Sequence, residues 1–174
     1  MIPKNRTLAA SWLVLAGLLL LSAGCGGIEG LPTSRAGWLG YRVGGLSLEL
    51  PEDWSARGDA VHLEARAPGG AAVLKAAQVE RPFASEAECL AQAEASVGRG
   101  AAGVERGRSH ATRLGGRSAF MLEGDQQGWH GWAWAACDGR RQYRVQFMGA
   151  SPMAAGIAAA QRGVEGSVRF DASR

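Results

Sequence analysis

The sequence has little of the residue chemistry from which most metal centres and active sites are built. It contains three histidines and three cysteines among 174 residues. His62, His110 and His130 stand far apart and form no H-x-x-x-H pair. Neither Cys89 nor Cys137 has a histidine or a further cysteine at a zinc-ligand spacing. We therefore expect no bound metal and no cofactor.

Motifs of the common enzyme classes are also missing. The segments "GRSAF" (116–120) and "GASPM" (149–153) contain a serine but lack the second glycine of a G-x-S-x-G nucleophile elbow. The chain has no P-loop and no complete dinucleotide-binding glycine pattern. We expect no catalytic residue and no enzymatic activity. A hydrolase is the alternative, and labelling by activity-based probes would reveal it.

The chain has no strong excess of charge of either sign. The 19 Lys and Arg residues face 16 Asp and Glu residues, and removal of Lys4 and Arg6 with an N-terminal leader leaves 17 against 16. A nucleic-acid partner is therefore not expected. Two arginine clusters are expected to be solvated strand faces, with a phosphate or anionic-lipid patch as the alternative. They are Arg140, Arg141 and Arg144, and Arg106, Arg108 and Arg113.

Only one long hydrophobic run occurs, and it lies at the N-terminus. The 14 residues from Leu8 to Leu21 would span about 21 Å as a helix, which is less than the roughly 30 Å hydrocarbon core of a bilayer. Lys4 and Arg6 precede the run, and small residues follow it, as is typical of a secretory signal peptide. We expect residues 1–24 to be a cleaved leader and not a permanent membrane span.

The leader ends in "LSAGC" (21–25), which resembles the lipobox of bacterial lipoproteins. The resemblance implies that a diacylglycerol is attached to the Cys25 thiol, that cleavage occurs just before it, and that the new amine receives a fatty acid such as palmitate. Ser22 stands where that family usually has leucine. With Gly26 next, the resemblance implies an anchor in the outer membrane, facing the periplasm. The alternative is that Cys25 is an incidental thiol in an ordinary secretory signal.

The domain boundaries follow from composition. Residues 25–40 comprise the cysteine and a stretch with five glycines and a proline, and this stretch has no sustained hydrophobic period. We interpret it as a flexible tether. Residues 41–174 are long enough for one globular domain with its own core.

Two cysteines remain besides Cys25. An exported chain meets an oxidising compartment, so the even pair Cys89 and Cys137 favours a disulfide. The alternative is two buried free thiols. Because the bond would close a loop of about 48 residues, the chain-entropy model assigns it roughly 4 kcal/mol.

Alternating patterns predict strands at 41–50, 61–67 and 71–80, with Trp54 folded into the core. Residues 84–100 are expected to form a helix that begins with a Ser85–Glu88 capping box. A second helix is expected to be capped by Ser151, with Pro152 in its first turn, and to run into a last strand at 167–170. The fold class is therefore α+β, with an antiparallel sheet of about six to seven strands flanked by helices.

Two hairpins are expected in the middle of the chain. Gly115-Gly116 joins strands within 104–123 and pairs Ala111 with Phe120, whereas Asp138-Gly139 joins strands within 128–149. The second hairpin pairs Trp134 with Tyr143 and gives one face large core residues that include Trp132. Trp129 and Met148 fall on its other face, near one end, and are the candidates for contact with a partner.

The order of "GLSLELPEDW", a capped helix, "LGGRSAF", "CDGRRQYRVQF" and a last helix leading to "GSVRF" resembles the PsbP-like family, including its DcrB-type envelope lipoproteins. The resemblance implies an α/β/α sandwich and a non-catalytic binding or assembly module with an envelope protein as partner. It supplies no site residues. The alternative function is a lipoprotein that binds a small molecule or lipid in an aromatic pocket.

Overall fold

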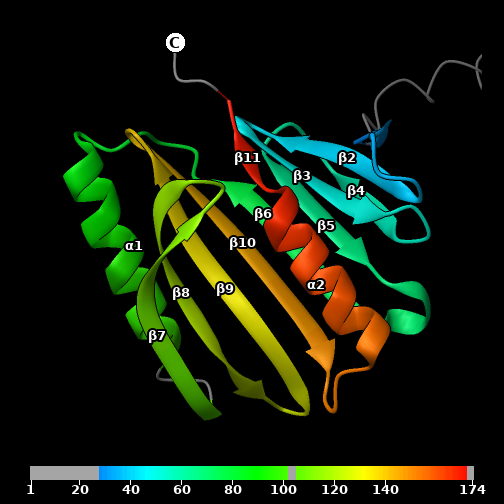
Figure 1. The fold of residues 1–174 in the computed structure, drawn as a ribbon. Coiled ribbons are helices and arrows are strands. Elements are labelled where there is room, and N and C mark those ends of the chain that lie inside the picture. Colours follow the sequence, from blue (N-terminus) through cyan, green and yellow to red (C-terminus); the bar gives the residue numbers. More distant parts are fainter. Residues whose placement is uncertain (1–27, 102–104, 172–174) are drawn as a thin grey trace, which may run out of the picture.

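The computed structural model describes residues 28–101 and 105–171, and it contains two antiparallel sheets and two α-helices (Figure 1). The large sheet has the spatial order β4 (Ser55–Gly58), β5 (His62–Arg66), β6 (Ala72–Gln78), β10 (Arg141–Ala150), β9 (Trp129–Asp138), β8 (Arg117–Gln126) and β7 (Glu105–Leu114). The small sheet has the order β1 (Leu31–Pro32), β2 (Trp38–Val43), β3 (Leu46–Pro51) and β11 (Arg169–Phe170).

The main core fills the space between the large sheet and a layer formed by the small sheet and helix α2 (Ala155–Ser167). Alternate residues of the strands point into this space, because successive side chains of a strand lie on opposite faces. Its largest fully buried side chains are Tyr143, Phe147, Leu46, Leu48, Leu50 and Leu74. Trp54 is buried here, as expected, with its ring 5.8 Å from that of Phe147.

Helix α1 (Glu86–Ala101) packs on the other face of the large sheet, mainly over β7, β8 and β9. Its buried stripe is Cys89, Ala93 and Val97, which meet Leu122 and Ala135 in a second, smaller core. The helix starts as predicted. The Ser85 hydroxyl accepts a hydrogen bond from the Glu88 N–H at 3.1 Å, and the Glu88 carboxylate accepts one from the Ala84 N–H at 2.7 Å.

The first predicted hairpin is confirmed, and the second is shifted by two residues. Ala111 pairs with Phe120 across a turn in which Gly115 and Gly116 both have positive φ. In the second hairpin Tyr143 pairs with Ala136, not with Trp134. Because a shift of two residues keeps every side chain on its face, the predicted core face is correct although the pairing is wrong.

Two predicted segments contain more structure than expected. The segment 41–50 is a hairpin and not one strand, since β2 and β3 join at Gly44-Gly45. Ordered structure also extends into the expected tether, where β1 pairs with β2 and the Trp38 ring packs against Gly163 of α2. The domain therefore begins before residue 41. The small sheet was not predicted.

The start of the second helix was also predicted wrongly. Helix α2 begins at Ala155, and no side chain caps it. The Ser151 N–H donates to the Gly128 carbonyl at 2.8 Å, which ties this residue to the turn between β8 and β9. The helix then continues to Ser167, so the last strand starts at Arg169.

Candidate functional site

Part of the large sheet is left uncovered on the face that carries α1. The helix lies over β7, β8 and β9, while β4, β5 and β6 form the far side of the same sheet (Figure 1). Three adjoining hollows lie across this uncovered part, and we call them together the sheet groove.

The central hollow of the sheet groove has a volume of about 350 Å³. Its principal lining residues are Arg66, Val73, Lys75, Trp129, Gln146 and Met148. A hollow of about 130 Å³ continues it toward β4, with Ser55, Arg57 and Glu64 in its lining. A third hollow of about 40 Å³ continues it toward α1, past Gly124, Gly131 and Leu122.

The two residues predicted for partner contact both lie in the central hollow. Met148 of β10 is paired with Val73 of β6 on one side and with Gly131 of β9 on the other. The Gln146 amide donates to the Met148 sulfur at 3.2 Å. A Cβ at Gly131 would lie 2.9 Å from Met148 Cγ, so Met148 leans over the glycine backbone.

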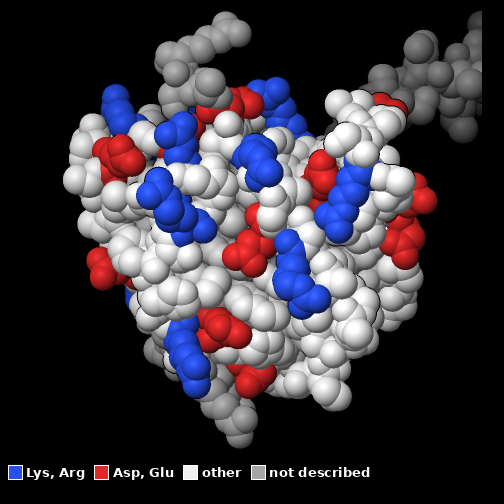
Figure 2. All heavy atoms as spheres, in the orientation of Figure 1, with Lys and Arg blue, Asp and Glu red and all other residues white. Residues whose placement is uncertain are grey.

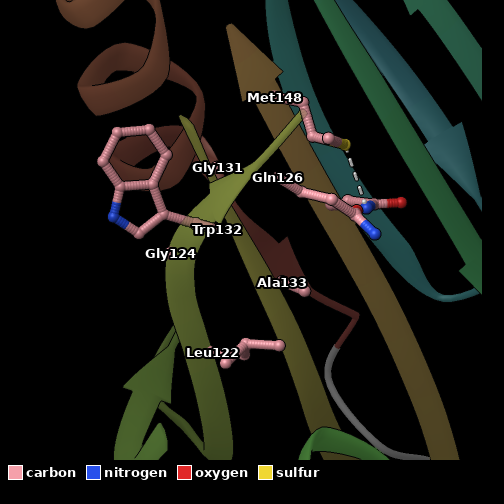
Figure 3. A pocket seen from close by; sticks show the side chains of 8 residues that line it. Leu122, Gly124, Gln126, Gly131, Trp132, Ala133 and Met148 are labelled. Atoms are coloured by element: carbon pink, nitrogen blue, oxygen red, sulfur yellow. Dashed lines mark hydrogen bonds between the residues drawn. The ribbon is translucent and has the colours of Figure 1, made fainter. Parts of the chain in front are cut away.

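The three neighbouring tryptophans of β9 divide between the two sides of the sheet. Trp129 lines the sheet groove, whereas Trp134 is only 3% exposed in the main core. Figure 3 shows Trp132 pointing to the opposite side of the strand from Met148 and Leu122. Trp132 packs against the main core, with its ring 6.3 Å from that of Phe147. The structure therefore supports the separation of core and surface tryptophans predicted from strand alternation.

Basic residues outnumber acidic ones on the groove side of β4, β5, β6 and β10. Four basic side chains (Arg57, Arg66, Lys75 and Arg144) share this side with the single acidic side chain of Glu64. The Glu64 carboxylate binds Arg57 at 2.9 Å and Arg66 at 2.8 Å. The hydrogen bond from Arg66, together with the charges of both arginines, lowers the pKa of Glu64.

A second, larger cleft of about 1170 Å³ lies where the ends of the two sheets meet. Its lining contains three basic residues (Arg42, Arg140 and Arg141) and three acidic residues (Glu80, Asp138 and Asp171). Asp138 forms an ion pair with Arg117, which lies outside the cleft, at 2.9 Å. Arg42 forms an ion pair with Asp171. The predicted cluster of Arg140, Arg141 and Arg144 is thus divided between this cleft and the groove side of the sheet. Equal numbers of opposite charges make the cleft a weaker candidate for a charged ligand.

The three histidines do not converge. The His130 ring lies between Asp125 at 2.8 Å and Glu123 at 3.3 Å, on the opposite side of the sheet from Met148. His62 contacts Asp59 at 3.3 Å, and His110 is exposed on β7. Within residues 28–101 and 105–171, no group of three or more His, Cys, Asp and Glu residues is arranged to hold a metal ion.

Cys89 and Cys137 form a disulfide that joins α1 to β9, with their Cα atoms 6.2 Å apart. Both residues are fully buried. Because Cys137 points to the face opposite the main core, the bond requires α1 to lie on that face, and it does. The predicted lipid attachment residue Cys25 lies outside the described residues. Among those residues, no helix is both long and apolar enough to span a bilayer.

Strand alternation alone could identify Trp129 and Met148, but not their neighbours. Arg66, Val73 and Lys75 come from strands more than 50 residues earlier in the chain. The pattern of residues 61–80 predicts that Arg66 and Lys75 are on a polar strand face. It carries no signal that β6 pairs with β10, which is the contact that forms the central hollow.

The comparisons with known proteins show a fold and no site. No protein-family model matches the chain, and no curated protein matches it. Among solved structures, the cyanobacterial PsbP (CyanoP) of Synechocystis sp. PCC 6803 has a TM-score of 0.53 at 14% identity, over 79% of this chain and 95% of that chain. A protein of Bacteroides thetaiotaomicron VPI-5482 has a TM-score of 0.52 at 10% identity, over 74% of this chain. The match covers only 46% of that longer chain. The chain has a PsbP-like fold.

Proposed function

We propose that this chain is a lipid-anchored protein of the bacterial cell envelope that binds a partner protein in the sheet groove and catalyses no reaction. The leader 1–24 and the "LSAGC" segment support an anchor at Cys25, and the glycine that follows supports the outer membrane, facing the periplasm. The order of α1, large sheet, and α2 with the small sheet supports the α/β/α sandwich of the PsbP-like family.

The observation that carries the proposal is the cluster of apolar side chains on an uncovered sheet face. Val73, Trp129 and Met148 line one hollow outside both cores. Aromatic residues and methionine are enriched where proteins meet, and a hollow framed by such side chains can receive the anchor residue of a partner. Ile28, the first described residue, packs against the main core on the other side of the large sheet. An anchor that precedes Ile28 is compatible with an open groove.

The proposed docking site is tested by site-specific crosslinking in intact cells of the native host. A photoreactive benzoylphenylalanine replaces Gln146, an exposed residue in the centre of the groove. The matched control replaces Arg162, an exposed residue of α2 on the opposite side of the molecule. We expect one defined protein to be crosslinked at position 146 and not at 162. Equal crosslinking at both positions, or none at 146, would contradict docking in the groove.

The proposed anchor is tested separately. We expect metabolic labelling with a fatty acid to mark the wild-type protein and not the Cys25→Ser variant. A wild-type protein that remains unlabelled, or whose leader is still attached, would contradict the anchor and leave the docking proposal unaffected.

A second candidate function is the binding of a small molecule or lipid in the same groove. The central hollow, at about 350 Å³, lies within the range of roughly 300 to 1,000 Å³ that is usual for small-ligand sites. Because Trp129 lines it, a bound compound should change the emission of that indole, and a Trp129→Phe variant should not show the change. Emission that is unchanged across a broad compound library would exclude this candidate.

A further inference from the structure

We infer that the segment bound in the sheet groove is acidic and amphipathic, with carboxylates facing Lys75 and Arg144 and an apolar side chain between Trp129 and Met148. The inference rests on the docking function proposed above and adds the chemistry of the partner. It follows from the charges of the groove, the position of its apolar hollow and the spacing between the two.

The positive charge of the groove side is only partly neutralised within the chain. Glu64 is the one acidic residue among the strand residues on the groove side of β4, β5, β6 and β10, and it is engaged by Arg57 and Arg66. The Lys75 ammonium has no carboxylate within ion-pair distance in the described part of the chain. The Arg144 guanidinium donates to the Gln142 amide oxygen at 3.3 Å and forms no ion pair there. Two basic groups are thus available to a partner that brings carboxylates.

The apolar part of the groove lies directly beside Lys75, whereas Arg144 lies two positions beyond Gln146 on β10 and outside the three hollows. Lys75 and Val73 are on the same side of β6, and they face Gln146 and Met148 on β10. Lys75 and Met148 are therefore diagonal neighbours on adjacent antiparallel strands, and such neighbours are about 7 to 8 Å apart. A similar spacing separates residues two apart in an extended ligand, so a segment with an acidic residue and an apolar residue at positions i and i+2 can place them over Lys75 and Met148.

The extent of the groove gives the length of the segment. The three hollows cross the strands from β4 to β8, which are six neighbouring strands. At about 4.8 Å between strands this is about 24 Å, or roughly seven residues of extended chain. The groove can therefore hold a short linear segment of a partner.

The side of the molecule that carries α2 and the cleft at the ends of the sheets offer less to an acidic segment. Figure 2 shows Lys and Arg side chains interspersed with Asp and Glu side chains on the side of the molecule that carries α2. The cleft at the ends of the sheets contains as many acidic as basic residues. Complementary charge steers association and rejects partners of the wrong sign, and the groove combines a basic surplus with an apolar hollow.

The inference is tested with defined peptides and the purified full chain. The probe is a fluorescein-labelled peptide of about nine residues, in which glutamate and leucine alternate at every second position with serine between them. In one analogue every glutamate is replaced by glutamine, and in another by lysine. Fluorescence anisotropy is measured at low salt and again at about 500 mM NaCl, where exposed charges are largely screened.

We expect the acidic peptide to bind at low salt at least about tenfold more tightly than the glutamine analogue, and the lysine analogue not to bind. The Lys75→Glu and Arg144→Glu variants should each weaken the acidic peptide by about tenfold. The Arg162→Glu variant makes the same charge change on α2 and should leave binding unchanged. Circular dichroism of each variant verifies that the fold is intact.

Equal binding of the three peptides, no binding of the acidic peptide, or an unchanged affinity in Lys75→Glu would overturn the inference. The crosslink at position 146 separates this failure from failure of the docking function. A crosslink that persists at full intensity in the Lys75→Glu background keeps the groove as the docking site but refutes an acidic partner. Absence of the crosslink in the otherwise wild-type chain refutes the docking function itself.

Discussion

Replacement of both Cys89 and Cys137 by alanine should lower the free energy of unfolding by about 4 kcal/mol. The bond links residues 48 apart in the sequence, and the chain-entropy model converts the closure of a loop of this length into about 4 kcal/mol at 25 °C. Reduction of the wild-type protein with a phosphine reductant should produce nearly the same loss. It breaks the crosslink without removing the two buried sulfur atoms, and so it serves as the control for the small cavities that the alanines create.

The assay is urea unfolding followed by two signals that report different parts of the molecule. Trp54 and Trp134 are buried in the main core, on the opposite side of the large sheet from the disulfide. Trp38 and Trp132 also pack against this core, so four of the five tryptophans among the described residues report its unfolding. Far-UV circular dichroism also includes α1, which is 16 residues long. If the disulfide stabilises the whole domain, both signals should shift together to lower urea concentration.

Two results would refute this reasoning. A loss below about 1 kcal/mol, with both signals still coincident, would mean that the unfolded chain is not appreciably constrained by the crosslink. A circular dichroism signal that changes before the fluorescence would mean that α1 detaches by itself. The disulfide would then stabilise the docking of one helix and not the fold as a whole.

Three further predictions concern single residues. Leu74 is fully buried in β6, so Leu74→Ala should cost about 3 kcal/mol in urea unfolding. Ser85→Ala removes the side-chain cap of α1 and should cost about 1 kcal/mol. Because Arg66 and Arg57 lower the pKa of Glu64, this carboxylate stabilises the fold above its ordinary pKa of 4.5, and the contribution is lost as the pH falls through the lowered value. The Glu64→Gln variant should therefore lose less stability than wild type on acidification; an identical acid profile would contradict the prediction.

The hairpins show what a local pattern can and cannot specify. Gly115-Gly116 fixes its register because both central residues need positive φ, and two adjacent glycines can occupy only that position. Asp138-Gly139 is ambiguous. In the structure Gly139 has a φ of 59° at the first central position and Asp138 pairs with Arg141, a placement suited to a type II′ turn. The sequence "DGR" is compatible with either turn, so neighbouring strands decide between them.

The unpredicted elements are short and have a weak hydrophobic pattern of their own. Strand β4 has four mostly polar residues and is held at the edge of the sheet by β5. Strand β2 begins within a glycine-rich segment, and its Trp38 is packed against α2, which comes more than 100 residues later. Hydrophobic periodicity is a local signal. It detected the strands whose alternate residues enter the core. It missed β4, which is mostly polar, and the start of β2, which is ordered by a helix from the other end of the chain.

The uncovered face that contains the sheet groove follows from the size of α1. A seven-stranded sheet is about 29 Å wide at 4.8 Å per strand, whereas a helix with its side chains is about 10 Å across and covers two or three strands. A strand that is exposed on one face needs only polar side chains there, and β5 meets this requirement with Glu64 and Arg66. Solubility does not require Val73, Trp129 and Met148 to lie together beside these polar residues. Their exposure is unfavourable, because each Å² of apolar surface left in water costs about 25 cal/mol. A bound partner that covers this apolar surface recovers the cost. For this reason we assign the docking function to the groove and not to the larger cleft, which has as many acidic as basic residues in its lining.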